Sequence, residues 1–497
     1  NTAIGKIALC ANTTGSCNVA IGVEAMDSNT TGGGNVGIGT DSLQGNTEGS
    51  SNVSIGDDTM KTNSTGSCNT AVGAGALCTN STASNNSAFG FKALEANTTG
   101  TNNSAFGKDA LLANTTASQN VAIGSLSSVT TTTGCKNTAV GHASFYNNST
   151  GDNNTALGNF ALNDNTTADD NTAVGYFALK ANTTGANNTA VGRCALTNNT
   201  DSRQNTGIGN IALFDNTEGE FNTAVGSQSL ADNTTADCNV AVGYTSLRKN
   251  TTGTSNTSVG TFSLACNTTA SFNTAVGYEA LTCNITGANL TAVGFKALCR
   301  NTGADNAAFG HGALAVSTTG GTNTAIGTSS FGSHTTGSNN TGVGAAVGYS
   351  LTTGSNNLLL GKNAGRSTSP ATVTTGSNNV VLGDNSIANA YIKVDWTVTS
   401  DLRDKTEITN VPHGLNFVNS LNPIKYRFKK SRDNDTPHGD IKYGFGAQDI
   451  LELEGDNPVI INNKDNELLK VTNSHLVPVL VNAIKELKAE IDELKKG

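Results

Sequence analysis

Two side chains near residue 400 have the types of a nucleophile and its base. Ser400 and Lys405 stand five residues apart in Ser-Asp-Leu-Arg-Asp-Lys. A serine hydroxyl becomes a nucleophile when a base takes its proton, and a lysine can be that base where burial lowers its pKa toward neutrality. The same residues also suit the start of a helix, because Ser followed by Asp is a good N-terminal cap, so the residues alone leave both interpretations open.

The sequence divides into regions of different composition, and these regions predict the elements that position Ser400 and Lys405. All six prolines lie beyond residue 369, and a long proline-free run fits continuous strand pairing. We predict an all-β solenoid over 1–383, a junction strand over 384–399, a small α+β domain over 400–475 and a coiled-coil helix over 476–497. The junction strand is expected because Ala390–Val398, which holds the only tryptophan, alternates in polarity.

A 17-residue repeat fills the first of these regions. Its consensus begins Asn-Thr-Ala-Val-Gly and continues through Ala-Leu to Asn-Thr-Thr-Gly, with a last copy at Asn379. Each unit predicts one coil of a parallel β-roll, made of two short strands and two turns. Two positions are predicted to fill the core. They are the fourth, as in Val72, Phe89, Ile123 and Leu157, and the ninth, as in Leu77, Leu94, Leu111 and Leu162.

The apolar content of each coil is small, about two large side chains and some alanines. Stacked neighbours bury a core that one coil cannot bury alone. We therefore expect backbone bonds between coils, ladders of asparagines and association between chains to supply most of the stability.

The twelfth position of many repeats is the asparagine of an Asn-x-Ser/Thr sequon. On an exposed turn these asparagines could carry a ladder of N-glycans; alternatively, Asn-Thr-Thr-Gly is simply the turn that the coil needs. The candidates are Asn12, Asn29, Asn63, Asn80, Asn97, Asn114, Asn148, Asn165, Asn182, Asn233, Asn250, Asn267 and Asn284.

Ten cysteines lie in the repeats, in no zinc or iron–sulfur spacing, so no metal and no cofactor is expected. Cys266 and Cys283 are one repeat apart and would stack at the strand spacing of about 4.8 Å. That spacing lies within the range that a disulfide accepts. A Cys266–Cys283 disulfide and two free thiols are both compatible with the sequence.

The C-terminal helix carries apolar residues at alternating three- and four-residue spacing, which is typical of a coiled-coil seam. The net charge of −9 does not favour nucleic-acid binding, and the absence of a run of about 18 apolar residues predicts no membrane insertion. The seam residues are Val477, Leu480, Ile484, Leu487, Ile491 and Leu494.

The repeats resemble the β-roll head of trimeric autotransporter adhesins and, more closely, the shaft repeats of phage and viral tail fibres. Three motifs beyond the repeats, Ser400–Lys405, Leu421–Phe428 and Tyr443–Ile450, occur in the order found in the C-terminal intramolecular chaperone of phage endosialidases and tail fibres. That resemblance implies a chaperone that trimerises the fibre before it and then cleaves itself off.

Mapped onto this chain, the resemblance implies cleavage between Thr399 and Ser400. Ser400 would be the nucleophile and Lys405 the general base, with Asp401 and Arg403 as the other residues of the motif. Family members often have a histidine just before Gly-Phe-x-Ala-Gln, where this chain has Lys442 and Tyr443. If that histidine assists, cleavage here is slow or does not occur.

Together these features predict a homotrimeric viral fibre or tail fibre, at the virion surface or otherwise extracellular, that attaches to a receptor or glycan on a host cell. Its only enzymatic activity would be one turnover of serine autoproteolysis. The alternatives are a bacterial cell-surface trimeric adhesin, which would need a secretion signal and a membrane anchor, and a purely structural extracellular filament. Because the chain begins at Asn1 without Met, we expect a fragment or a processed product.

Overall fold

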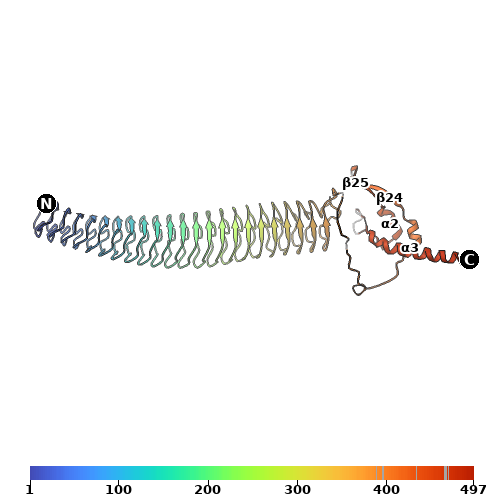
Figure 1. Ribbon diagram of the computed structural model, residues 1–497, viewed down its shortest axis with the longest axis horizontal. Coiled ribbons are helices and arrows are strands. Elements are labelled where there is room, and N and C mark those ends of the chain that lie inside the picture. Colours follow the sequence, from blue (N-terminus) through green and yellow to red (C-terminus); the bar gives the residue numbers. More distant parts are fainter. Residues whose placement is uncertain (388, 395–396, 433, 464–466, 468, 497) are drawn as a thin grey trace. The chain divides into compact units, whose positions relative to one another are not determined.

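A computed structural model describes residues 1–387, 389–394, 397–432, 434–463, 467 and 469–496. The chain forms two compact units, Asn1–Gly383 and Asp384–Gly497. The first is a regular stack of coils and the second is a small unit with three α-helices (Figure 1). Each unit is described by itself below.

The first unit is a parallel β-solenoid, as the repeat predicted. Each coil contributes one three-residue strand, and each strand pairs in parallel with the strand of the next coil (Figure 1). Thr155 lies opposite Thr172, and Ala156 opposite Ala173, so equal repeat positions stack. Strands β1 to β23 are, in order, Thr2–Ile4, Val19–Ile21, Val36–Ile38, Val53–Ile55, Thr70–Val72, Ser87–Phe89, Ser104–Phe106, Val121–Ile123, Thr138–Val140, Thr155–Leu157, Thr172–Val174, Thr189–Val191, Thr206–Ile208, Thr223–Val225, Val240–Val242, Thr257–Val259, Thr274–Val276, Thr291–Val293, Ala307–Phe309, Thr324–Ile326, Thr341–Val343, Leu358–Leu360 and Val380–Leu382.

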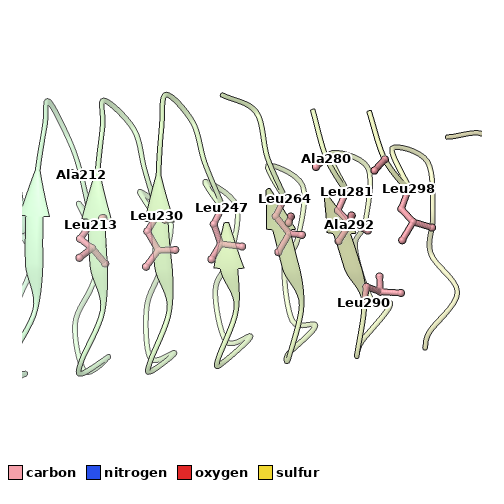
Figure 2. Close-up of a cluster of buried hydrophobic side chains, with 14 of the residues drawn as sticks. Ala212, Leu213, Leu230, Leu247, Leu264, Ala280, Leu281, Leu290, Ala292 and Leu298 are labelled. Carbon is pink, nitrogen blue, oxygen red and sulfur yellow. The ribbon is translucent and has the colours of Figure 1, made fainter. Parts of the chain in front are cut away.

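The core of the solenoid is a file of leucines and a file of alanines. Leu77 and Leu94, at the ninth position, are fully buried as predicted, and Figure 2 shows Leu213, Leu230 and Leu247 side by side in successive coils. The prediction for the fourth position was wrong. The strand buries its middle residue, the alanine at the third position, and the large residue after it points outward.

The reason for this difference is the narrow interior of the coil. Ala105 and Ala122 are fully buried, whereas the following Phe106 and Ile123 are 39% and 43% exposed. Alternation in a strand requires that one set of side chains faces inward, and here only the small set fits beside the leucine. The fourth position therefore forms an apolar stripe on the outside of the solenoid.

The second side of the coil is not a strand, which also corrects the prediction. Residues at the seventh and ninth positions have left-handed backbone conformations, as in Lys92 (φ 57°) and Leu94 (φ 55°). A left-handed residue other than glycine costs roughly 1–2 kcal/mol. Bonds between coils offset this cost, because the Lys92 N–H donates back to Ala74 (3.0 Å) and the Leu94 N–H donates forward to Ala110 (2.9 Å).

Two asparagine ladders run through the solenoid, as the thin core led us to expect. At the first position, the Asn52 N–H donates to Asn35 Oδ1 of the coil before (2.9 Å), and Asn52 Nδ2 donates to the Gly66 carbonyl (2.8 Å). At the twelfth position, Asn63 Nδ2 donates to Asn46 Oδ1 (2.7 Å) and to Gly66 (2.9 Å). Fully paired polar networks of this kind specify the register of buried segments.

One break in the twelfth-position ladder allows a test of its contribution. Thr131 stands there in place of asparagine, and both Thr131 Oγ1 and Asn114 Oδ1 are buried without a partner. Such groups cost about 1–3 kcal/mol each, so Thr131→Asn should restore the ladder and stabilise the fold by roughly that amount. Thermal denaturation should show a higher midpoint. Thr133→Asn on the exposed turn is the control and should change little; equal midpoints for all three proteins would contradict this role.

The second unit is a small α+β unit with two antiparallel pairs of strands. Strand β24 pairs with β25 and β26 pairs with β27, and Phe417, Ile450 and Leu476 are among the buried residues of its core. Its elements are the 3-10 turn η1 (Leu402–Asp404), α1 (Leu415–Ser420), β24 (Pro423–Ser431), β25 (Asn434–Phe445), α2 (Ala447–Glu454), β26 (Ile461–Asn462), β27 (Lys470–Val471) and α3 (Asn473–Leu494).

The junction strand expected over 384–399 is not formed in the described residues of that stretch. Tyr391 and Val398 are 92% and 80% exposed, and an apolar strand needs a neighbouring strand and a surface to cover it. Trp396, part of the same prediction, lies outside the described residues. Among the residues that the structure describes, no helix is long and apolar enough to cross a membrane.

Candidate functional site

The motif that begins at Ser400 forms one tight helical turn. Asp401 caps η1, because its carboxylate accepts the Arg403 N–H at 2.9 Å. At the other end, the Lys405 N–H donates to the Leu402 carbonyl at 3.2 Å. The turn thus folds the five residues after Ser400 back on themselves, which brings the two ends of the motif together.

The side chains of Ser400 and Lys405 meet across this turn. Lys405 Nζ donates to Ser400 Oγ at 2.7 Å, and both residues are exposed. This distance is within the reach required for proton transfer between a nucleophile and its base. The cap of the turn is Asp401, so the capping interpretation of Ser400 is not the one the structure adopts, and its hydroxyl is engaged by Lys405. The Thr399–Ser400 peptide bond precedes the turn in an exposed stretch without regular structure.

Asp401 and Arg403 form the support of the turn. Arg403 Nε lies 3.1 Å from both carboxylate oxygens of Asp401, and its Nη2 lies 2.5 Å from Oδ2. The Arg403 side chain, and then its N–H, hold the pKa of the Asp401 carboxyl below its usual range. The cap therefore stays ionised at neutral pH, and an ionised cap is the better acceptor for the first amides of the turn.

The position at which family members often carry a histidine lies at the end of β25. Lys442 there places Nζ 5.4 Å from the centre of the Phe428 ring of β24, and Tyr443 is 83% exposed. Neither side chain is an imidazole that could shuttle a proton near neutral pH. Lys405 is the side chain that contacts Ser400 Oγ, at 2.7 Å.

The asparagines of the sequons do not lie on an exposed surface, which corrects that expectation. Asn12 is partly buried, and the twelve others have fully buried side chains. Their Nδ2 groups, which would carry a glycan, donate hydrogen bonds inside the ladder; Asn182, for example, donates to Asn165 Oδ1 and to Gly185 at 2.9 Å. A glycan on the folded coil would require breaking both bonds, so the ladder explains these asparagines without glycosylation.

All ten cysteines are free thiols in the structure. Cys266 and Cys283, for which the sequence left a disulfide and two free thiols open, are both free in the structure. Cys299, which the sequence argument did not consider, stands in the coil that follows Cys283. Among the described residues, no group of three or more His, Cys, Asp or Glu side chains is arranged to hold a metal ion.

The coiled-coil seam lies on one face of α3, and the adjoining face packs within the unit. Leu476, Val479 and Ala483 are buried, and Glu486 accepts the Leu415 N–H of α1 at 2.6 Å. The seam residues are all exposed in the single chain, with Val477 at 58% and Ile484 at 65%. The stripe of fourth-position residues on the solenoid is a second exposed apolar surface, and the sequence argument missed it by placing these residues in the core.

Comparison with known families agrees with the motif at Ser400. Residues 400–457 match the family described as chaperone of endosialidase. The match begins at the serine of the candidate pair and includes the turn, β24, β25 and α2. No curated protein and no solved structure matches the chain. The resemblance of the C-terminal segment to this chaperone family is thus confirmed for residues 400–457, and the resemblance of the repeats to fibre shafts and adhesin heads stays a prediction.

Proposed function

We propose that this chain is a structural fibre protein in which the solenoid is the shaft and the residues from 400 onward are its assembly chaperone. Three chains associate along their solenoids, and the chaperone then cleaves the Thr399–Ser400 bond. The observation that carries this proposal is the 2.7 Å contact between Lys405 and Ser400, at the first residues of a segment that matches the chaperone of endosialidase. The fibre would belong to a virion and attach it to a receptor or glycan of a host cell, as the resemblance of the repeats to tail fibres implies.

Self-association is supported by the apolar stripe of the solenoid. The last residue of every strand from β1 to β23 is Ile, Val, Phe or Leu, without one polar substitution. Many of these residues are more than a third exposed, including Phe89 and Phe309. Contiguous exposed apolar surfaces of this extent mark interaction sites. A second copy of the chain is the occupant that fits best, because it repeats at the same coil spacing along the whole length.

The exposed seam of α3 supports the same conclusion for the C-terminal unit. Its residues repeat at the spacing of a coiled coil, which requires partner helices of the same length. The assembly of three is inferred from the resemblance to trimeric fibres, since so short a seam does not set the number of strands by itself. A short coiled coil would hold the chains in register while the shafts associate.

The cleavage chemistry follows from the position of Ser400 at its own scissile bond. Lys405 removes the hydroxyl proton and Ser400 Oγ attacks the Thr399 carbonyl carbon, so that an ester forms, the C–N bond breaks and the Ser400 nitrogen takes up a proton. Water then hydrolyses the ester and leaves a Thr399 carboxylate and a free Ser400 hydroxyl. A lysine acts as a base where it is removed from water. Because the pair is exposed in the single chain, we infer that assembly covers it, so that cleavage follows association.

Deletion of residues 400–497 tests the chaperone role. The truncated chain should give no soluble trimer, since nothing aligns the shafts, whereas full-length Ser400→Ala should still assemble because it keeps the chaperone. Size-exclusion chromatography with light scattering measures both. Normal trimers from the truncated chain would refute the chaperone role, and loss of trimers in Ser400→Ala would show that cleavage, and not the domain, drives assembly.

A further inference from the structure

The twelfth-position asparagine ladder is interrupted between the coil that contains Asn284 and the coil that follows it. The coil from Leu290 to Asp305 has 16 residues, and Leu290 stands at its first position where asparagine is expected. The leucine side chain cannot accept the hydrogen bond that asparagine accepts at this position. In the coil before, Nδ2 of Asn273 is buried without a partner. At the twelfth position, Asn301 donates to Gly303 of its own turn (2.5 Å), not to the coil before. The first-position bond to the coil before is kept, because the Leu290 N–H donates to Asn273 Oδ1 at 3.0 Å. The twelfth-position bond between these two coils is missing, and we call this gap the ladder fault.

Two thiols stand on either side of the ladder fault. Cys283 belongs to the coil before it and Cys299 to the 16-residue coil, and the Cys283 N–H donates to the Cys299 carbonyl at 2.9 Å. Both line one shallow groove with Glu279, Lys296 and Arg300. Cys266 is not part of this groove lining, and its N–H donates to Thr282 at 3.1 Å. Within the groove, the neighbour of Cys283 is therefore Cys299.

We propose that Cys283 and Cys299 form a redox pair that closes to a disulfide across the ladder fault. The oxidant is a small-molecule disulfide such as oxidised glutathione. The Cys283 thiolate attacks one sulfur of that disulfide and releases one thiol. Cys299 then attacks the mixed disulfide, which releases the second thiol. Two protein thiols thus lose two electrons and two protons, and one small disulfide becomes two thiols.

The environment of the two sulfurs fits this order of attack. Cys283 is exposed, so it can meet the oxidant, while Cys299 is half-buried. Burial, and then the nearby Cys283, raise the pKa of the Cys299 thiol, and the cations Lys296 and Arg300 oppose that rise. An exposed sulfur reacts first with a soluble disulfide and a more protected one resolves the product. The bond would join the two coils covalently at the place where the twelfth-position ladder does not.

Peptide mapping of the full-length chain distinguishes the possible pairings. Trypsin cuts after Lys249, Lys296 and Arg300, so Cys266 and Cys283 fall on the peptide 250–296 and Cys299 on 297–300. After treatment with oxidised glutathione and alkylation, mass spectrometry should find 250–296 joined to 297–300. The linked pair should persist in Cys266→Ser and be lost in Cys283→Ser and in Cys299→Ser.

The proposal is overturned by any of three results. The first is a disulfide confined to the peptide 250–296, which would be the Cys266–Cys283 pairing. The second is full alkylation of Cys299 after oxidation. The third is a crosslink that joins two chains on a denaturing non-reducing gel. The first two results depend neither on cleavage at Ser400 nor on trimer formation, so this proposal can fail while the proposed function holds.

Discussion

Replacing Ser400 with alanine is expected to leave the chain at its full length, whereas the unaltered chain should separate into a shaft and a fragment of the last 98 residues (400–497). The substitution removes the oxygen that Lys405 contacts at 2.7 Å, and no other nucleophile occupies that place in the turn. Removal of the nucleophile typically lowers the rate of peptide-bond cleavage by several orders of magnitude. Denaturing gels and intact mass after expression measure the result.

Lys405→Arg is the matched control for the base. Arginine keeps the positive charge and the reach, but it does not give up its proton in proteins. Lys405→Arg should therefore block cleavage while leaving the turn folded. Loss of Arg403, which supports the Asp401 cap, should only slow cleavage. Identical fragments from the unaltered chain and from Ser400→Ala would exclude self-cleavage at this bond.

A carboxylate in the apolar stripe of the solenoid should abolish assembly. Ile208 is 39% exposed in the single chain, so Ile208→Asp leaves the coil foldable but places a charge where chains would meet. Burying an unpaired carboxylate costs several kcal/mol, and each 1.4 kcal/mol weakens association about tenfold. A trimer would bring three of these carboxylates together at the same coil. Sedimentation of Ile208→Asp should therefore show monomers in place of trimers.

Thr184→Asp is the control for the stripe. It adds the same charge at the fourteenth position, where neighbouring coils already carry Asp201 and Glu218 on the exposed turn. This variant should remain trimeric, and both variants should keep the circular dichroism of the unaltered chain. Trimers of Ile208→Asp at unchanged concentration would show that the chains do not meet along this stripe.

The repeat period predicts a solenoid but does not determine which side chains fill its interior. The period predicted the solenoid, and Leu94 belongs to its core as expected. Alternation in the strand showed that one set of side chains faces inward but not which set, because this depends on the width of the coil. Ala88 fits inside and Phe89 does not. The left-handed residues, such as Lys92, carry no turn signature in the sequence, since bonds between coils impose their conformation.

The same limit applies to the asparagines and to the site. The sequence Asn-Thr-Thr-Gly is compatible with a turn and with a glycan acceptor. Only the stacking of the coils in the structure shows that Asn97 donates to Asn80 Oδ1. At the site, spacing placed Ser400 and Lys405 in one motif, but it could not assign the cap. A carboxylate that an arginine holds ionised is the stronger acceptor, so Asp401 caps the turn and Ser400 remains available to Lys405.

The mass of the intact assembly under native conditions tests the central claim most directly. The unaltered chain should give a complex of three chains, each of which ends at Thr399, together with a separate C-terminal fragment that begins at Ser400. A single uncut chain of 50.4 kDa under conditions where the shaft is folded would contradict both the assembly and the cleavage that this structure supports.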